Sequence, residues 1–504
     1  MKDPVQIELR PLGRTIEVER GTALRDVLYA HGVEFPCGGR GHCGCCRVQV
    51  LEGALPVTAE EAAILGADEQ AQGWRLACRS RAVEPVALQV EQFAAPVLAD
   101  HSSFEFEPRS GLGVAVDVGT TTLVAQLIDL QSGRVLAVET ALNPQAAYGS
   151  DIMHRAHGAL EEQQRIKLTT LVRDAIDAMV QRALTAAGPG DKPVDAVVLV
   201  GNSVMHHLFS GLPLVSLARF PFESDNDGMQ IFSPRELGWG LPADTLVQFL
   251  PCLGSFVGSD LLVGVLATGM HESDELSILV DLGTNGEIVL GNRERMLCAS
   301  TAAGPAFEAG GISMGMQATT GAIDRVANTG TRLDCGVIGN RKAAGVCGSG
   351  LVDAVAAGLE LGWIEPSGRL AGGRKTLELS GAVHLTQGDI RQLQLAKGAI
   401  AAGLDILLKH WGATPDAVAH VHLAGAFGNY IDSNSARRIG MIEFPHSEVE
   451  PAGNTALLGA KLALFQREAK AREFRQLRAR IEHVALAVAP GFQDTFINET
   501  RFPA

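Results

Sequence analysis

The sequence of 504 residues predicts a multidomain protein of the α+β and α/β classes, with a small β-grasp domain ahead of a duplicated α/β unit. Five of the nine cysteines lie in residues 1–92, among short strand-like segments and one helix-like segment. A buried strand that ends in Asp-x-Gly-Thr occurs twice, at 114–122 and 278–287. The length also corresponds to about three to five domains or subdomains.

The N-terminal domain, residues 1–92, is predicted from alternating polar and apolar positions. Period-two alternation indicates strands, and the apolar spacing of one segment indicates a helix. The order of these segments, strand, strand, helix, strand and a later strand, is typical of a β-grasp domain. The predicted strands are 5–9, 15–19, 46–53 and 84–91, and the predicted helix is 23–32.

Residues 93–110 show little periodicity and are expected to form a linker. The next part of the chain, residues 111–270, is predicted to be a first α/β subdomain. It contains strand-like runs separated by turn residues, then a long helical stretch at about 151–187 and a buried strand at 195–203.

A similar order returns in residues 271–504, which we expect to form the second subdomain. Strands occupy 275–300, helices occupy about 351–361 and 387–410, and a buried strand occupies 420–428. Two copies are too few for a solenoid. Duplicated βββαβ-type units with a cleft between them fit the pattern better.

Composition and charge argue against several classes of function and location. The net charge is −15, which argues against general electrostatic binding to nucleic acid or to an anionic membrane. No run of 18 apolar residues is present, and residues 1–19 lack the apolar core of a signal peptide. We therefore expect a cytoplasmic protein whose cysteines are ligands or buried thiols rather than disulfides.

The stretch CGGRGHCGCC at 37–46 indicates a metal-cluster loop. Cys37, Cys43 and Cys46 have the spacing C-x5-C-x2-C, and Cys78 follows in a later segment. The plant-type [2Fe–2S] pattern is C-x4-C-x2-C…C, which differs by one residue in the first loop. Glycines between the cysteines allow the backbone to approach a cluster closely. The sequence therefore predicts a [2Fe–2S] cluster bound by these four cysteines.

One alternative for this loop is a zinc site with four cysteine ligands. Zinc sites usually pair two short C-x2–4-C segments, whereas here three ligands share one loop. Cys45 is the spare cysteine, because Cys46 has the two-residue gap from Cys43 that the ferredoxin pattern requires. The four isolated cysteines in apolar surroundings are expected to be buried small hydrophobes. They are Cys252, Cys298, Cys335 and Cys347.

The repeated Asp-x-Gly-Thr predicts a two-sided phosphate site. A hairpin tip of Gly and Thr can direct N–H and hydroxyl groups at a phosphate, and the Asp can hold Mg²⁺ through water. One copy alone is more often a plain hairpin, whereas two copies on comparable strands favour a site. The residues of the first copy are Asp117, Gly119, Thr120, Thr121 and Thr122, and those of the second are Asp281, Gly283, Thr284 and Asn285.

Two further loops are candidates. Gly348, Ser349 and Gly350 precede a helix whose N-terminus could meet a phosphate, or they form a plain strand-to-helix turn. Glu308, in a loop of small residues, could bind metal or orient a water, or it could belong to a structural turn. Asp117, Asp281 and Glu308 are the predicted catalytic residues.

These segments resemble the superfamily of ATPases that includes acetate and sugar kinases, heat-shock chaperones and actin (ASKHA). VAVDVGTTT resembles its first phosphate motif, ILVDLGTNGE its second, and VHLAGAFGN its adenosine motif. The resemblance implies a duplicated RNase H-like ATPase fold that binds ATP and Mg²⁺. It also implies that the adenosine motif contacts the nucleotide through Gly425, Ala426, Phe427 and Gly428.

The combination of a cysteine domain with NPQAAYGSDIMHR, GNSVMHHL, TAAGPAFE and CGSGLVD resembles the reductive activators of corrinoid proteins over essentially the whole chain. The resemblance implies an ATP-hydrolysing corrinoid protein reductase, which passes one electron from a [2Fe–2S] cluster to a partner whose cobalt has become Co(II). The partner would be the corrinoid protein of a methyltransferase system. An external electron donor is also implied, and a homodimer is suggested.

Two alternatives stay open at this point. One is an ASKHA small-molecule kinase with an accessory ferredoxin domain, for which the sequence shows no clear general base. The other is an ATP-dependent activator of a different low-potential metalloenzyme. Activators of that kind place cluster cysteines inside the ATPase fold, whereas here the cysteines lie in a separate domain.

Overall fold

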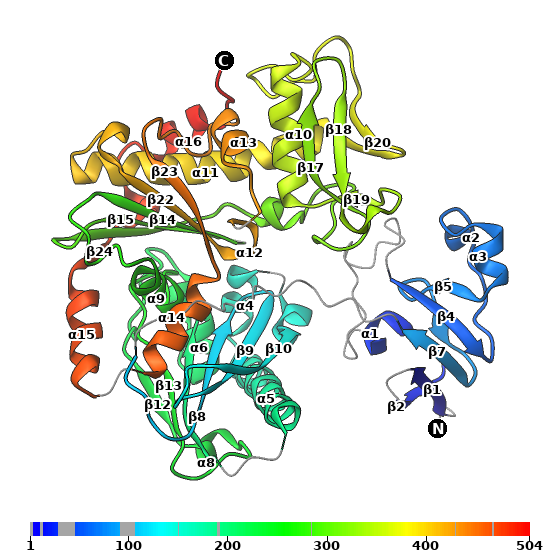
Figure 1. Cartoon of the computed structure of the whole chain (residues 1–504), viewed down its shortest axis with the longest axis horizontal. Helices are drawn as coiled ribbons and strands as arrows, with labels where there is room; N and C mark the ends of the chain where they lie inside the picture. Colours follow the sequence, from blue (N-terminus) through cyan, green and yellow to red (C-terminus); the bar gives the residue numbers. More distant parts are fainter. Residues whose placement is uncertain are drawn as a thin grey trace.

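The structure is a computed structural model, and it contains three main sheets (Figure 1). The ranges that it describes are 4–10, 14–28, 46–90, 106–149, 151–188, 192–283, 285–428, 430–465 and 468–504. Within these ranges, no helix is both long enough and apolar enough to span a bilayer.

The N-terminal sheet has the strand order β2-β1-β7-β4-β5. The pair β1–β7 is parallel and the other pairs are antiparallel, which confirms the β-grasp prediction. Alternate residues of β1 are buried, because a strand points successive side chains to opposite faces. The elements are β1 Pro4–Arg10, β2 Arg14–Glu19, β3 Thr22–Ala23, α1 Leu24–Leu28, β4 Arg47–Glu52, α2 Ala59–Ala62, α3 Ala67–Ala71, β5 Trp74–Leu76, β6 Arg81–Ala82 and β7 Val86–Val90.

The second sheet has the order β10-β9-β8-β11-β13-β12. β8 is antiparallel to β9 and parallel to β11, and β11 is parallel to β13. β8 and β11 are apolar along most of their length because helices cover both faces of the sheet. The strands are β8 Leu112–Val118, β9 Thr122–Asp129, β10 Val135–Leu142, β11 Val194–Val200, β12 Gln230–Phe232 and β13 Leu246–Phe249.

The third sheet repeats this arrangement, with the order β23-β22-β14-β15-β16-β24. β14 is antiparallel to β15 and parallel to β22, and β22 is parallel to β23. The order β16-β15-β14-β22-β23 therefore matches β10-β9-β8-β11-β13, strand for strand and direction for direction. This match confirms the predicted duplication. The strands are β14 Ser277–Leu282, β15 Gly286–Gly291, β16 Met296–Thr301, β22 His420–Ala424, β23 Glu448–Gly453 and β24 Ile481–His483.

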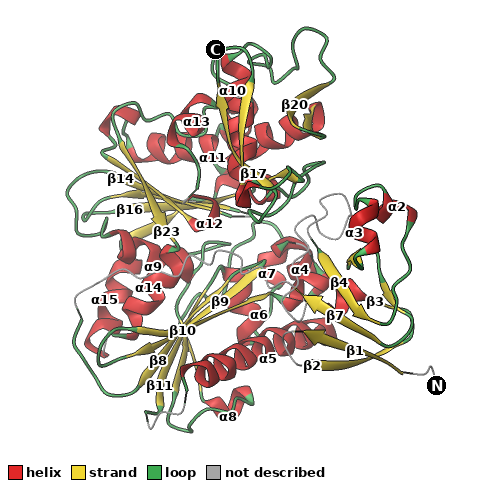
Figure 2. Cartoon of the chain, turned by 45° about the vertical axis from the view of Figure 1, so that its right-hand side comes forward, coloured by secondary structure: helices red, strands yellow, loops and turns green. Residues whose placement is uncertain are grey.

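The second and third sheets stack with a layer of helices between them (Figures 1 and 2). Apolar residues of α9 (Ser259–Thr268) and α14 (Thr455–Leu464) share one hydrophobic core with residues of both sheets. α5 (Glu162–Ala187) covers the outer face of one sheet, and α11 (Gln387–Trp411) covers the outer face of the other. The site described below lies where the first strand of each sheet meets the central helices.

Smaller elements complete the described part of the chain. They are α4 Ile152–Gly158, α6 Ser203–Ser210, α7 Val215–Ala218, α8 Pro234–Leu237, β17 Ala322–Asn328, β18 Leu333–Val337, β19 Gly345–Val346, α10 Gly348–Glu360, β20 Thr376–Ser380, β21 Val383–Thr386, α12 Gly425–Gly428, α13 Ser433–Arg438, α15 Glu468–Ala479 and α16 Phe492–Glu499.

Three sequence predictions differ from the structure. The strand predicted at 195–203 ends at Val200, because Asn202 caps α6, which begins at Ser203. The helix predicted at 151–187 is two helices, α4 and α5, because α4 ends at Gly158 and a turn precedes α5. The strand predicted at 420–428 ends at Ala424, because Gly425 has a φ of +84° and turns the chain into α12.

The predicted linker, 93–110, lies mostly outside the described residues. Its final residues are described, and they pack on residues next to α14 and in β11. The ring of Phe106 is 4.5 Å from that of Phe465, and Arg109 forms an ion pair of 2.9 Å with Asp195.

Candidate functional site

Two aspartates occupy the same position in the duplicated units. Asp117 is the second-last residue of β8, and Asp281 is the second-last residue of β14. Burial raises the pKa of Asp117 to about 6, although Asn454 Nδ2 donates a hydrogen bond of 3.2 Å to Asp117 Oδ2. Burial, and then the charge of Asp117, raise the pKa of Asp281 to about 7. Asp117 is therefore close enough to Asp281 to affect its ionisation.

Two further carboxylates belong to the same region, and the sequence reasoning did not identify them. Asp260 lies in the first turn of α9, and burial followed by the charges of Asp281 and Asp117 raises its pKa. Glu287 lies in β15, and burial followed by the charge of Asp260 raises its pKa well above the usual value. Two sequence signals could have identified them. Asp260 follows Gly-Ser at the start of a helix, and Glu287 lies two residues beyond Asn285.

These four carboxylates are at least partly buried, and the charges of their neighbours raise the pKa values of Asp260, Asp281 and Glu287, so that together they form a strongly anionic site. A divalent cation would favour their ionised forms. They are not among the described groups of three or more metal-ligating side chains whose ligand atoms lie within 4.8 Å of one another. Such wider spacing fits a hydrated ion, and Mg²⁺ usually keeps several of its waters in proteins.

The first hairpin, Gly119–Thr122, is held by two asparagines from other elements. Asn143 Nδ2 donates to the carbonyl of Gly119, and Asn202 Nδ2 donates to Thr120 Oγ1, each at 2.9 Å. A Cβ on Gly119 would lie 2.4 Å from the carbonyl oxygen of Thr122, so only glycine fits this turn. Thr121 and Thr122 follow the turn and are at least partly exposed. The loop is therefore positioned before any ligand binds.

The second hairpin brings together three segments that are distant in the sequence. The amide of Gly283 donates to the carbonyl of Asn285 at 3.0 Å, while Thr284 lies outside the described residues. Glu308 Oε1 is 3.9 Å from the position that a Cβ on Gly283 would take. A Cβ on Gly425 would be 2.7 Å from Asp281 Oδ1. The structure thus places Glu308 and the start of α12 beside the second Asp-x-Gly-Thr turn.

Other predicted binding residues are involved mainly in packing. A Cβ on Gly348 would lie 1.8 Å from the carbonyl oxygen of Phe307, and one on Gly350 would lie 2.2 Å from that of Ile323. Ser349 is buried and donates its hydroxyl to the carbonyl of Asp324 at 2.8 Å. This packing accounts for all three small residues, and a phosphate contact by them stays a prediction.

The segment Gly425–Gly428 forms α12, and its residues differ in what they contact. The ring of Phe427 is buried and stacks on Phe307 at 4.9 Å between centroids, so it points into the core. A Cβ on Gly428 would lie 2.9 Å from the carbonyl carbon of Leu423. The side chain of Ala426 lies outside the described set. A nucleotide contact by this segment would come from its backbone.

Two of the four predicted cluster cysteines lie in the described part of the chain. The amide of Ala77 donates to the carbonyl of Cys46 at 2.8 Å. Cys78 directly follows Ala77, so the segments that carry Cys46 and Cys78 lie side by side. Cys46 belongs to the core of the ferredoxin-type sheet, and Cys78 packs at the edge of that core. Cys37, Cys43 and Cys45 lie outside the described residues. The geometry fits two ligands of one cluster on adjacent segments.

The isolated cysteines follow the prediction with one exception. Cys252, Cys298 and Cys347 are buried, and burial raises the pKa of each thiol. Cys335 is only partly buried.

Family models match successive parts of the chain. A model of the 2Fe–2S iron-sulfur cluster binding domain matches residues 7–83, and a model of the RACo middle region matches residues 112–273. A model of the C-terminal ASKHA domain of RACo matches residues 275–504. Together they cover both predicted modules.

The corrinoid activation enzyme RamQ of Eubacterium limosum is 33% identical over 421 residues, which are 77% of this chain and 70% of the relative. The chain belongs to the family of corrinoid activation enzymes. A second member, the [Co(II) methylated amine-specific corrinoid protein] reductase of Methanosarcina barkeri, is 25% identical over 77% of each chain. The solved structure of a reductive activator for a corrinoid, iron–sulfur protein aligns with 99% of this chain and 98% of its own, at 26% identity and a TM-score of 0.69.

These comparisons confirm the predicted family, the [2Fe–2S] ferredoxin domain and the ASKHA-type ATPase fold. Both the cluster and ATP are therefore cofactors that the chain's domains support. The assignment of individual ligands within the two sites stays a prediction.

Proposed function

We propose that this chain is an ATP-dependent reductive activator, which transfers one electron to the Co(II) corrinoid of a partner protein and regenerates Co(I). The observation that carries the proposal is the presence, in one chain, of a ferredoxin sheet and a duplicated ATPase unit with acidic residues at both first strands. Relatives named as a corrinoid activation enzyme and a Co(II) corrinoid protein reductase support it. The partner would be the corrinoid protein of a methyltransferase system.

ATP is needed because the electron transfer is uphill. A plant-type [2Fe–2S] centre has a reduction potential of about −400 mV, and the proposal requires that the Co(II)/Co(I) couple of the partner has a lower potential. For one electron, each ~59 mV costs about 1.4 kcal/mol. A nucleotide that binds two conformations with different affinities can shift their populations by that amount or more.

In the proposed ATP site, the carboxylates of Asp117 and Asp281 hold a hydrated Mg²⁺, with Asp260 and Glu287 adding negative charge around it. Hydroxyl and N–H groups of the two hairpins bind the phosphates, and Glu308 orients the attacking water. Mg²⁺, when bound, neutralises charge on the phosphate oxygens. The backbone of α12 binds the adenosine. The contacts that support this arrangement are those between Gly425, Glu308 and the second hairpin.

For the electron-transfer site, we assign Cys37, Cys43, Cys46 and Cys78 as ligands and Cys45 as a non-ligand. The [2Fe–2S] cluster, when bound, supplies the one-electron carrier. We also propose that an external electron donor reduces it, that the chain acts in the cytoplasm, and that it forms a homodimer.

The test uses cluster-loaded protein that has been reduced chemically and then freed of the reductant. It is mixed anaerobically with a Co(II) corrinoid protein, and the optical spectrum of Co(I) is followed with and without ATP and Mg²⁺. We expect Co(I) only when both are present. If several corrinoid proteins from methyltransferase systems stay in the Co(II) state with ATP present, the proposal is wrong.

A further inference from the structure

Two histidines and two glutamates face one another across adjacent strands of the third sheet. In the parallel pair β22–β23, His420 lies opposite Glu448, and His422 lies opposite Glu450. Residues two apart on a strand share a face, so all four side chains project from the same side. Val421 and Leu423, between and beyond the histidines, point to the opposite side and join the core under α11.

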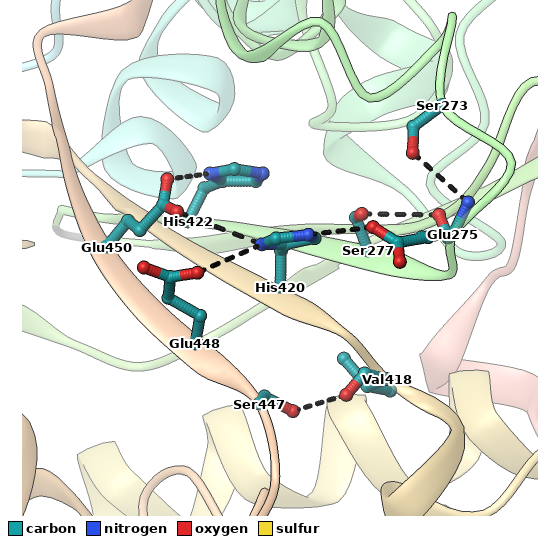
Figure 3. A network of polar contacts seen from close by, with 9 residues as sticks. All are labelled: Ser273, Glu275, Ser277, Val418, His420, His422, Ser447, Glu448 and Glu450. Atoms are coloured by element: carbon teal, nitrogen blue, oxygen red, sulfur yellow. Dashed lines mark hydrogen bonds and ion pairs between the residues drawn. The ribbon is translucent and has the colours of Figure 1, made fainter.

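The ligand atoms of three of these side chains converge. His420 Nδ1 is 4.0 Å from Glu448 Oε2 and 3.8 Å from Glu450 Oε1 (Figure 3). One atom from each of the three residues lies within 4.8 Å of the other two. Ligands about 2.1 Å from a tetrahedral metal lie roughly 3.4 Å apart, so small rotations of the side chains would suffice to enclose an ion.

The surroundings orient these ligands. On its other side, His420 Nε2 is 3.0 Å from Glu275 Oε2. A carboxylate can only accept a hydrogen bond, so this contact favours the neutral tautomer with the hydrogen on Nε2, in which the lone pair of Nδ1 faces the two glutamates. A carboxylate behind a histidine is the usual outer partner of a metal-bound imidazole. His422 Nδ1 lies 3.5 Å from Glu450 Oε2, the second oxygen of that carboxylate, and so helps to fix it.

The charge balance also favours a cation. Within the described part of the chain, Glu275, Glu448 and Glu450 have no ion pair with a lysine or arginine, and their only ionic partners are the two histidines. Three carboxylates therefore face two imidazoles, of which His420 is neutral when it binds a metal. One divalent ion would remove most of this excess negative charge.

We propose that His420, Glu448 and Glu450 form a binding site for a divalent transition metal of the zinc type. Imidazole nitrogen with carboxylate oxygen is a donor set that suits zinc, and water would complete the coordination of this half-exposed site. Glu275 orients His420, and His422 orients Glu450. The site is separate from the ATP site, and it goes beyond the proposed electron transfer.

The position of the site indicates a structural role. Ser277 pairs with His420 and Asp281 pairs with Ala424, so the site lies four residues, or about 13 Å, from the Asp281 end of the sheet. β23 is an edge strand of its sheet, and its neighbour β22 leads directly into α12. A metal bound to both strands would tie this edge strand to the strand that carries the predicted adenosine motif.

The experiment titrates cluster-loaded full-length protein with Zn²⁺ by calorimetry, without nucleotide and with excess Mg²⁺ to occupy the four carboxylates of the proposed ATP site. We expect one Zn²⁺ per chain, lost in His420→Ala and in the nearly isosteric Glu448→Gln. Glu275→Gln should bind about ten- to hundredfold more weakly. His410→Ala is the matched control, because His410 Nε2 is 3.2 Å from the single carboxylate of Glu482. It should bind as the unaltered protein does.

Zinc could instead bind cysteines, so the second measurement identifies the donor atoms. X-ray absorption at the zinc edge should show nitrogen and oxygen neighbours and no sulfur. Unchanged affinity in Glu448→Gln and His420→Ala, a sulfur shell around zinc, or no binding by the unaltered protein would each overturn the proposal. The circular dichroism and thermal unfolding of every variant are recorded, because the third sheet has a core separate from that of the cluster domain. A variant that fails to fold is thereby recognised and replaced by the other.

Discussion

At the residue scale, the carboxylates of Asp117 and Asp281 are held in an arrangement that is unfavourable without a ligand. Each lies at the end of a buried strand, and burial raises the pKa of both, to about 6 and about 7. A buried carboxylate that lacks a cationic partner takes up a proton instead of staying charged. Without a bound cation, these carboxylates are therefore expected to be partly protonated near neutral pH and to release protons when a cation binds.

This arrangement predicts a pH-dependent stability for the nucleotide-free protein. Folding raises the pKa of Asp281 from 3.8 to about 7, so the folded state holds the proton more tightly. The resulting stabilisation is complete below about pH 4 and is lost as the pH rises through 7. In Asp281→Asn, the melting temperature should therefore fall less between pH 5.5 and 8.5 than in the unaltered protein. Asp416→Asn, which changes an exposed carboxylate, should follow the unaltered protein.

A second prediction at this scale concerns catalysis. Asp117→Asn keeps the shape of the side chain but removes the negative charge that would hold Mg²⁺. We expect ATP turnover to fall by about 10²-fold or more, a loss typical of removing one electrostatic group from a catalytic site. The visible spectrum of the [2Fe–2S] centre should not change. Turnover within twofold of the unaltered protein would mean that the first hairpin does not act on ATP.

At the element scale, the junction of β22 and α12 brings the predicted adenosine motif to the second hairpin. Gly425 has a φ of +84°, and a Cβ there would be 2.7 Å from Asp281 Oδ1 and 2.9 Å from the carbonyl oxygen of Leu282. Gly412 has the same φ of +84°, but a Cβ there would have no neighbour within 4 Å. Alanine substitutions at these two positions therefore distinguish the effect of backbone strain from the effect of a steric clash.

We predict that Gly425→Ala weakens binding of an ATP analogue by more than tenfold, because the methyl group displaces Asp281 or the turn. Gly412→Ala carries the same backbone strain, of order 1 kcal/mol, and should bind nearly as the unaltered protein does. Calorimetry on both variants makes the comparison. Equal losses in the two variants would show that general strain, and not the contact with Asp281, is the cause.

The sequence predicts features that repeat or follow strict spacing. Asp117 and Asp281 are predicted because the same strand ending occurs twice, and the cysteine ligands because of their spacing, and the roles of these residues stay predictions. Asp260 was missed because its partners come from strands that only the fold brings together. Phe427 was predicted as a cofactor contact, yet its ring stacks on Phe307 in the core. No local pattern tells which way such a side chain points.

At the scale of the whole molecule, the ATPase unit and the ferredoxin sheet differ in how they are connected. Apolar residues of α9 and α14 form one core with both ATPase-type sheets. A structural change at β8 or at β14 can therefore be transmitted to the other strand through α9 and α14, which pack against both sheets. The ferredoxin sheet has its own core, made of residues 5–88. ATP binding and cluster binding should accordingly be separable by mutation, while electron transfer requires both.

Because the cores are separate, we predict that mutations in one module leave the binding function of the other module intact. Cys46→Ala should lose the [2Fe–2S] absorption and yet bind an ATP analogue within about twofold of the unaltered protein, because its core does not include the ATPase unit. Asp117→Asn should keep the cluster and lose turnover, and neither variant should form Co(I) from a Co(II) corrinoid protein. Cys45→Ala is the control for Cys46→Ala and should keep both the cluster and activity. If Cys46→Ala weakens nucleotide binding more than tenfold, the two modules are coupled in their stability. In that case ATP would act on the cluster domain through direct contact, and not through a change in how the whole chain docks on its partner.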